Sequence, residues 1–156
     1  MTTSDRRQRY ADLVLCVAAA TILFAMMILS TIDVVARYVF RRPVRGAFEV
    51  TELMLVVLIF AGLPLVSFSD EHAVMDFIDR LLGAHGRRAL DRGVQALNGA
   101  FMLLLAWLTW LKADRIWAYR DATDVLRILY GPFVYFMAVS LALAGLIHAW
   151  KVVERR

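Results

Sequence analysis

Residues 13–32 read LVLCVAAATILFAMMILSTI, a run without a charged side chain. A membrane-spanning helix needs about 20 mainly apolar residues, because the hydrocarbon layer is roughly 30 Å thick. Core helices of soluble proteins rarely stay uncharged for so long, since one face of such a helix meets water. This stretch therefore predicts a helix that crosses a membrane, and not a buried helix of a soluble bundle.

Three more uncharged runs follow along the chain, at residues 53–69, 93–111 and 128–150. Lipid offers no partners for backbone N–H and C=O groups, so each run is expected to be a helix. We predict an all-α integral membrane protein that forms a single membrane domain over residues 1–156. The predicted spans cover roughly residues 13–35, 50–69, 93–112 and 130–150.

The chain has 156 residues, of which 61% are hydrophobic, and a single cysteine. Cys16 lies inside the first run, so it has no partner for an intrachain disulfide and is interpreted as a packing residue. The sequence holds no Cys/His spacing of a metal site, no nucleophile motif and no phosphate loop. We therefore predict that the protein is not an enzyme, with no catalytic residues and no bound cofactor or metal.

Both ends of the chain are basic. The positive residues there are Arg6, Arg7, Arg9, Lys151, Arg155 and Arg156. Four spans place both ends on the same side of the membrane, and positive residues favour the cytoplasmic side. We interpret the net charge of +4 as attraction to anionic lipid headgroups, and expect no nucleic acid as partner.

The segment after the second run has a different pattern. Apolar residues recur there at helical spacing, and Asp76, Asp79 and Arg80 fall on the opposite face. The apolar set is Val74, Phe77, Ile78, Leu81 and Leu82. This pattern predicts a short amphipathic helix at roughly residues 72–83, lying in the membrane interface and ending near Gly83 and Gly86.

Acidic residues stand at the ends of the first two runs. Asp33 comes one helical turn before Arg37, a spacing that favours an ion pair. Glu49 and Glu52 open the second run, where carboxylates complement the partial positive charge of a helix N-terminus. A competing interpretation is that the two glutamates orient a partner subunit.

Small and polar residues in the last two runs favour contacts between helices. Gln95 and Asn98 are expected to link helices rather than to bind a substrate. Ala138, Ala142 and Gly145 share a face of the fourth run, where small side chains allow close approach. We expect this face to pack within the chain, with a dimer contact as the alternative.

The residues between the first two runs carry a resemblance to a known family. Residues 37–53 read RYVFRRPVRGAFEVTEL, in which Arg-Tyr-x-Phe precedes a proline and the acidic residue Glu49 follows. The next span contains Phe60 and Gly62, and residues 71–76 then read EHAVMD. This ordered set resembles the small membrane subunit of tripartite ATP-independent periplasmic (TRAP) transporters, of the DctQ type.

The sequence departs from the family pattern in two places. Gly46 and Val57 stand where many members have tryptophan. The fourth span is usually introduced by an Ile-Pro step, whereas here Ile128 is followed by Leu129, and Pro132 comes later. The resemblance nevertheless extends over nearly the whole chain.

The resemblance implies a small permease subunit in the bacterial inner membrane. A periplasmic binding protein would deliver an organic acid, and a sodium gradient would drive its import. The large permease subunit would hold the substrate and sodium sites, with the small subunit as its scaffold. The implied contacts with partners are Arg37, Glu49, Glu52, Phe60, Gly62, His72 and Asp76. The residues expected to dock the binding protein or to contact headgroups are Arg41, Arg42, Arg45, Trp117 and Tyr119.

Two other functions remain open from the residues alone. A stand-alone, proton-coupled four-helix exporter needs an acidic residue in the middle of its first span, whereas Asp33 lies near the end of that span. A membrane-bound haem protein needs histidines that face each other within the bundle. The positions of His72, His85 and His148 do not suggest such a pair.

Overall fold

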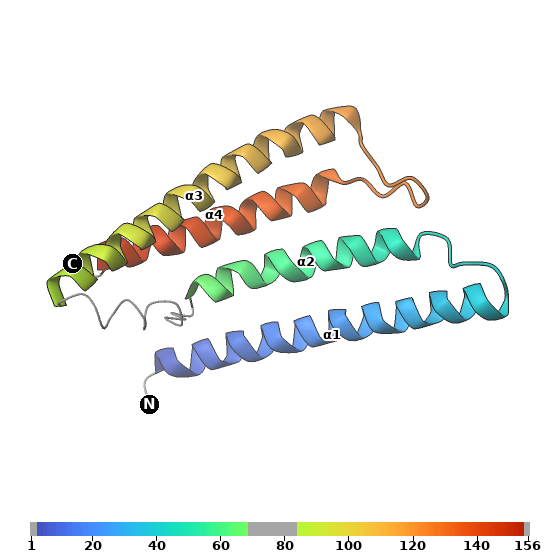
Figure 1. Cartoon of the computed structure of the whole chain (residues 1–156), viewed down its shortest axis with the longest axis horizontal. Coiled ribbons are helices and arrows are strands. Elements are labelled where there is room, and N and C mark those ends of the chain that lie inside the picture. Colours follow the sequence, from blue (N-terminus) through green and yellow to red (C-terminus); the bar gives the residue numbers. More distant parts are fainter. Residues whose placement is uncertain (1–2, 69–83, 155–156) are drawn as a thin grey trace.

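A computed structural model describes residues 3–68 and 84–154 of the chain (Figure 1). The helices in these residues are α1 (Thr3–Val39), α2 (Ala47–Phe68), α3 (Ala84–Tyr119) and α4 (Gly131–Glu154). All four are long and apolar enough to cross a membrane, which confirms the predicted all-α membrane fold with four transmembrane helices. The interfacial helix predicted at residues 72–83 lies outside the described residues, as do His72 and Asp76.

Two of the helices are longer than a membrane requires. Their apolar parts are Cys16–Val39 in α1 and Gly93–Tyr119 in α3. α3 begins at Ala84, so the charged stretch 84–92, which lies between the predicted interfacial helix and the predicted third span, is helical. Arginine, alanine and leucine are strong helix formers, and they let the helix extend beyond its apolar run. Gly86, expected near a helix end, lies within the first turn of α3.

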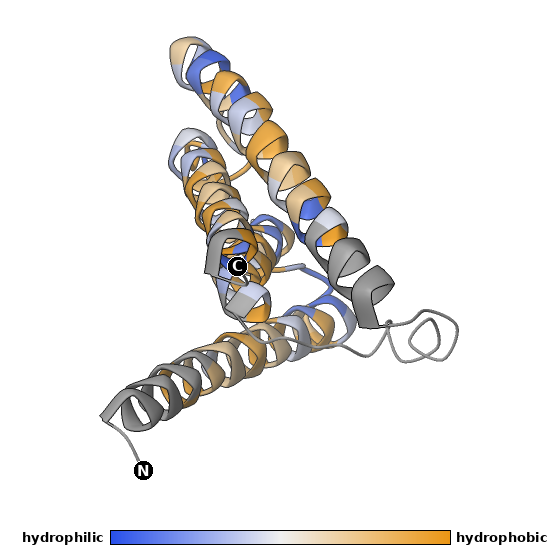
Figure 2. Cartoon of the chain, turned by 90° about the vertical axis from the view of Figure 1, so that its left-hand side faces the viewer, coloured by the Kyte–Doolittle hydropathy of each residue, from blue (hydrophilic) through white to orange (hydrophobic). Residues whose placement is uncertain are grey.

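The helices form a row rather than a closed bundle. α1 packs on α2, α2 packs on α4, and α4 packs on α3. Among the described residues α1 does not pack on α3 or α4, and α2 does not pack on α3. Figure 2 shows α1 diverging from the other helices. The spatial order is therefore α1–α2–α4–α3, which differs from the order along the chain.

Small residues bring α3 and α4 close together. Buried small residues recur every seven positions on both helices, namely Gly99, Ala106 and Ala113 in α3 and Gly131, Ala138 and Gly145 in α4. A Cβ atom added to Gly145 would lie 2.9 Å from Cγ of Leu103 and 3.2 Å from its backbone nitrogen. We call this contact the small-residue seam. The expected packing of the Gly145 face within the chain is confirmed, with Ala142 only half-buried at its edge.

α1 buries little of its surface. Apolar side chains of α1 that are more than half exposed include Leu13, Val14, Val17, Leu23, Phe24, Met27, Ile32 and Val39. Apolar patches of this extent mark contacts with a membrane or with another protein. In a bilayer, the surface of α1 is therefore covered by lipid or by helices of a second protein.

The α1–α2 pair and the α3–α4 pair have their connecting loops at the same end of the molecule (Figure 1). The start of α1 and the end of α4 lie at one end of the molecule, which we call the terminal end (Figure 1). Residues 40–46 and 120–130 lie at the opposite end, which we call the loop end (Figure 1). α4 begins at Gly131, and Pro132 occupies its first turn, where the missing N–H costs little.

Candidate functional site

The loop end gathers most of the residues expected to contact partners. Arg37, Arg41, Arg42, Arg45, Glu49, Glu52, Trp117 and Tyr119 belong to the two loops or to the helix turns beside them. Phe60 and Gly62 lie further along α2, away from this group. The loop end is therefore the part of the described chain in which a candidate site can be built.

Asp33 holds the α1–α2 loop against the end of α1. One of its carboxylate oxygens accepts a hydrogen bond from Nη2 of Arg37 at 2.7 Å, which confirms the ion pair predicted from their spacing. The other oxygen accepts a hydrogen bond from the backbone N–H of Val44 at 2.9 Å. Arg41, with φ of 52°, turns the chain between these two points. This single carboxylate thus fixes the path of the loop.

The α3–α4 loop forms a small hairpin with its own hydrogen bonds. The N–H of Thr123 donates to the carbonyl of Ile128 at 2.9 Å, and the N–H of Ile128 donates to Oγ1 of Thr123 at 3.0 Å. The N–H of Tyr130 donates to the carbonyl of Asp121 at 3.0 Å. Thr123 is only 1% exposed. The hairpin therefore has a defined shape outside the helices.

Two arginines of this hairpin adopt the left-handed backbone conformation. Arg120 has φ of 52°, and Arg127 has φ of 57°. At Arg120 the N–H of Asp121 donates to the carbonyl of Ile116 at 3.1 Å, which ends α3 in the pattern that usually requires glycine. A side chain in this conformation costs roughly 1–2 kcal/mol. Both arginines are exposed, so burial of their side chains does not offset this strain.

Glu49 of α2 holds the tip of the hairpin. Its Oε1 accepts a hydrogen bond from the N–H of Val125 at 2.7 Å, and its Oε2 accepts one from the N–H of Leu126 at 2.9 Å. Hydrogen bonds to a charged acceptor are roughly twice as strong as those between neutral groups. We call this pair of bonds the Glu49 latch. The latch connects the start of α2 to a loop that lies 76 positions later in the sequence.

Gly46 allows the hairpin tip to approach the start of α2. Its φ is +79°, a conformation that glycine adopts without penalty. A Cβ atom built at Gly46 would lie 2.4 Å from Cγ of Leu126 and 2.6 Å from its Cδ1. A side chain is therefore excluded both by the backbone conformation and by the space that Leu126 fills.

Carboxylates surround Tyr130 beside the latch. Burial is the largest cause that raises the pKa of Tyr130 above its ordinary value, and the negative charges of Glu52, Glu49 and Asp124 raise it further. Each of these causes disfavours the phenolate form. Three carboxylates thus lie close to Tyr130, of which Glu49 is half-buried and Glu52 and Asp124 are exposed.

Aromatic rings cluster where α3 and α4 meet this loop. Trp110 and Trp117 both contact Tyr135 edge to face, with ring centroids 5.2 Å and 6.3 Å apart. The hydroxyl of Tyr135 donates a hydrogen bond to Asp114 at 2.5 Å. Tyr119 is 80% exposed at the end of α3. Tryptophan and tyrosine are enriched at membrane–water interfaces, so these rings mark the depth of the interface.

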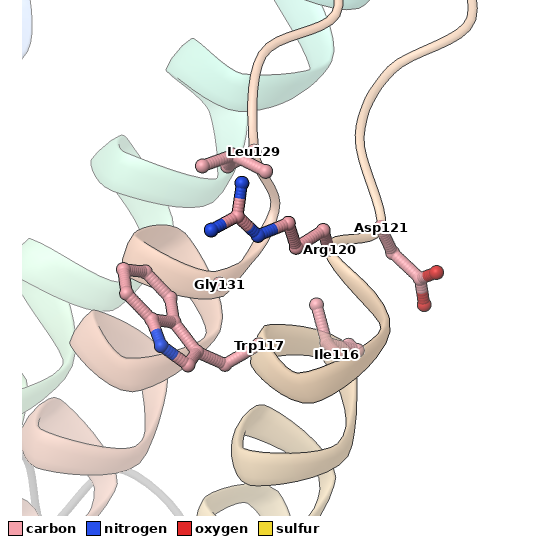
Figure 3. A pocket seen from close by; sticks show the side chains of 6 residues that line it. All are labelled: Ile116, Trp117, Arg120, Asp121, Leu129 and Gly131. Atoms are coloured by element: carbon pink, nitrogen blue, oxygen red, sulfur yellow. The ribbon is translucent and has the colours of Figure 1, made fainter.

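A cavity of about 180 Å³ lies at the junction of α3 and α4 (Figure 3). Its lining includes Trp117, Gly131, Leu129 and Arg120. In Figure 3 the guanidinium of Arg120 reaches toward Leu129, while the carboxylate of Asp121 points away. Another cavity, of about 280 Å³, is lined only by apolar residues of α1, α2, α4 and the hairpin. Among the described residues, no group of three His, Cys, Asp or Glu side chains could hold a metal ion.

Comparison with known families decides what kind of protein this is. The sequence pattern of the family described as "Tripartite ATP-independent periplasmic transporters, DctQ component" matches residues 26–156. The chain belongs to this DctQ family. No curated protein matches the sequence. The resemblance inferred from residues 37–76 is thereby confirmed, and the protein is a transporter subunit and not an enzyme.

The matched region of the DctQ subunit contains the whole loop end. DctQ components act, as a family, together with a large permease subunit and a periplasmic binding protein. With its four membrane-crossing helices, this DctQ subunit is a multi-pass membrane protein. Family membership leaves no support for the exporter and haem alternatives.

Polar side chains also connect the helices of the DctQ subunit at its terminal end. Nζ of Lys151 donates a hydrogen bond to the carbonyl of Ser67 in the last turn of α2, at 2.6 Å. Oε1 of Gln95 and Nδ1 of His148 lie 2.6 Å apart, which confirms that Gln95 links α3 to α4. α2 is therefore fixed to the α3–α4 pair at both ends, by Glu49 and by Lys151.

Sequence reasoning about the DctQ subunit missed the role of Gly46 and the hydrogen-bond partner of Glu49. Gly46 was noted only as a departure from a family tryptophan, although a glycine just before a helix is a recognised signal for a special backbone conformation. The contact of Glu49 with the hairpin had no signal in the sequence, because backbone N–H groups are present at nearly every residue.

Proposed function

We propose that this DctQ subunit is the small permease subunit of a sodium-driven importer of an organic acid. In this proposal the large subunit holds the substrate and sodium sites, and a periplasmic binding protein delivers the acid. Membership of the family supports the assignment of the subunit. The transported acid would be recognised by the two partners and not by this chain.

The proposed location is the bacterial inner membrane, with both termini in the cytoplasm. The start of α1 and the end of α4 lie together at the terminal end (Figure 1), and the basic residues of both chain ends favour the cytoplasmic side. The loop end then faces the periplasm. Its aromatic rings would lie in the outer interface, and the hairpin tip would lie beyond them.

The observation that supports a scaffold role is the open row of helices. A row leaves apolar faces of α1 exposed along its length, where helices of a larger protein can pack. The ionisable side chains Asp33, Glu49 and Asp114 lie toward the ends of their spans rather than at mid-membrane. Substrate and ion pathways usually contain ionisable groups within the membrane, so these features favour bracing a partner over binding a charged substrate.

Purification of the tagged chain from its native membrane in mild detergent tests the proposal. We expect a much larger polytopic protein to co-purify in equal amount, and mass spectrometry identifies it. Uptake by the complete reconstituted system should require both this chain and an inward sodium gradient. Recovery of the chain alone or as a homodimer, or uptake that is independent of sodium, would contradict the proposal.

Replacement of Asp33 by asparagine distinguishes the subunit hypothesis from the hypothesis of a stand-alone exporter. The amide oxygen of the new side chain can still accept the hydrogen bond of Val44, and the lost ion pair involves an exposed Arg37, so stability should change little. Uptake by the complete transporter should therefore be close to that of the wild type. Loss of all transport in the Asp33→Asn variant, with the protein still folded, would instead give Asp33 a role in coupling.

A further inference from the structure

We infer that Glu49 is a positioning residue, which holds the α3–α4 hairpin in the shape that receives the soluble binding protein. The inference rests on the proposed function, because it takes the loop end to face the periplasm. It concerns the internal contact that shapes the docking surface, and it treats the exposed arginines of the hairpin as the groups that meet the partner.

The first support is the choice of partner that Glu49 makes. Glu49 lies in the first turn of α2, three residues after Gly46. A glutamate at this position commonly reaches back to the free N–H groups at the start of its own helix. Here both carboxylate oxygens accept hydrogen bonds from Val125 and Leu126 instead. Glu49 thus bonds to a distant loop and not to the N–H groups at the start of α2, as its position in the sequence would suggest.

The second support is the strained and exposed hairpin that the latch holds. Arg120 and Arg127 keep positive φ angles and both residues are exposed, although the guanidinium of Arg120 lies beside Leu129 at the cavity (Figure 3). Strain of this kind persists where surrounding contacts enforce it, and it is concentrated at functional sites. At Arg127, which follows Leu126, the Glu49 latch and the contact of Leu126 with Gly46 are the contacts that enforce it, whereas the positive φ of Arg120 belongs to the hydrogen-bonded end of α3.

The third support is that the neighbouring α1–α2 loop is also held by a carboxylate. Asp33 holds the α1–α2 loop through the N–H of Val44, as Glu49 holds the hairpin through two N–H groups. In both loops a carboxylate is bonded to the backbone and arginine side chains are exposed, namely Arg41, Arg42, Arg45, Arg120 and Arg127. The loop end is therefore a preorganised surface with several exposed arginines, in which Asp33 and Glu49 fix the shape of the loops while Glu52, Asp121 and Asp124 are exposed beside the arginines.

A folded protein with an acidic face fits this surface better than lipid headgroups do. Headgroups attract arginines by charge alone and adapt to them, so they do not require a loop of fixed shape. A folded partner gains affinity when the loop that receives it is already ordered, because less conformational entropy is lost on binding. Complementary charge then speeds the encounter of the two proteins.

The test compares Glu49→Gln with the wild type in the complete transporter, with uptake measured over a range of binding-protein concentrations. A glutamine can accept only one of the two hydrogen bonds, and its amide group would oppose the other N–H. If the hairpin is then correctly shaped for only a fraction of the time, the half-saturating concentration should rise roughly fivefold, with the maximal rate unchanged. Glu49→Asp, which keeps both oxygens, should restore part of the loss.

Asp121→Asn is the matched control for charge. It also removes one negative charge from the loop end, but the carboxylate of Asp121 points away from the cavity between α3 and α4 (Figure 3). Loss of a negative charge alone should strengthen the attraction for an acidic partner, so it cannot raise the half-saturating concentration. An equal rise in Asp121→Asn and Glu49→Gln would therefore overturn the inference.

Trypsin reports the shape of the hairpin independently of transport. Cleavage after Arg127 should be several times faster in Glu49→Gln than in the wild type, because an opened loop fits a protease active site. Faster cleavage with an unchanged half-saturating concentration would make the latch purely structural and overturn its role in docking. Unchanged cleavage would show that there is no latch.

A further variant separates a protein partner from lipid. Arg120→Gln together with Arg127→Gln should raise the half-saturating concentration without opening the hairpin. Because no basic residue then remains between residues 120 and 130, the shape of the hairpin is judged by the rate of chymotrypsin cleavage after Leu126. If this variant loses binding to anionic vesicles while uptake is unchanged, the surface serves lipid and the inference fails. Failure of the proposed function would give a different result, namely uptake that does not require this chain at all.

Discussion

Replacing Gly46 by alanine should lower the free energy of unfolding by about 3 kcal/mol, the sum of a backbone cost and a packing cost. The backbone at Gly46 has φ of +79°, where a Cβ atom is disfavoured. The new methyl group would also overlap the side chain of Leu126, whose Cγ would lie 2.4 Å away. Thermal denaturation of the purified chain in mild detergent measures the change.

The chain provides a matched control for this substitution. A Cβ atom added to Gly62 in α2 meets nothing within 4 Å, so Gly62→Ala should change the stability little or raise it. In a Leu126→Ala background the overlap disappears, and Gly46→Ala should retain only the backbone cost of roughly 1–2 kcal/mol. Equal melting temperatures for Gly46→Ala and Gly62→Ala would show that the close approach of the hairpin does not exist in the membrane protein.

Replacing Gly145 by valine should be comparably harmful, at about 3 kcal/mol, because it overpacks the small-residue seam. Even the first carbon of the new side chain would lie 3.2 Å from the backbone nitrogen of Leu103, and backbone cannot move aside as a side chain can. In a membrane, close contact between helices is a main source of their association, since burial of apolar surface contributes little. Melting in detergent and the yield of the assembled complex should both fall.

Gly62→Val is the control for the seam, because it places the same β-branched residue in a helix of the same chain where nothing crowds it. Its effect should be limited to a change in helix propensity, which is a few tenths of a kcal/mol. Leu103→Ala should relieve part of the damage caused by Gly145→Val. If the two valine variants melt at the same temperature, the seam is not the contact that joins α3 to α4.

The four helices and some contacts within them follow from local features of the sequence. A helix that crosses lipid needs a long uncharged run, and that requirement is visible without any knowledge of neighbours. The pair of Asp33 and Arg37 depends on a spacing of four residues, which places both side chains on one helix face. Gly145 could likewise be assigned to a close contact from its own helix.

The Glu49 latch could not be predicted in this way. From the sequence, Glu49 had two plausible partners, the dipole of its own helix and a second subunit, and the structure shows a third. The groups that it binds are backbone N–H groups, which carry no mark of residue type. Such a contact becomes visible only when the path of both loops is known.

The spatial order of the helices also could not be predicted from the sequence. Hydropathy shows which segments enter the membrane, but lipid tails are as apolar as leucine, so apolar surface alone does not choose neighbours. The choice here depends on the seam between α3 and α4 and on the two polar ties at the ends of α2. Each of these contacts joins residues that are far apart in the chain.

The row of helices has a consequence for tilt in the bilayer. Packed helices lie roughly 8–10 Å apart, so four helices in a row extend over roughly 25–30 Å between the outer axes, against about 10 Å along a side of a square bundle. A protein that packs along such a row is gripped across that breadth. The tilt of that protein relative to the membrane normal is then restrained in the direction of the row, because contacts far apart along the row would have to break for it to tilt.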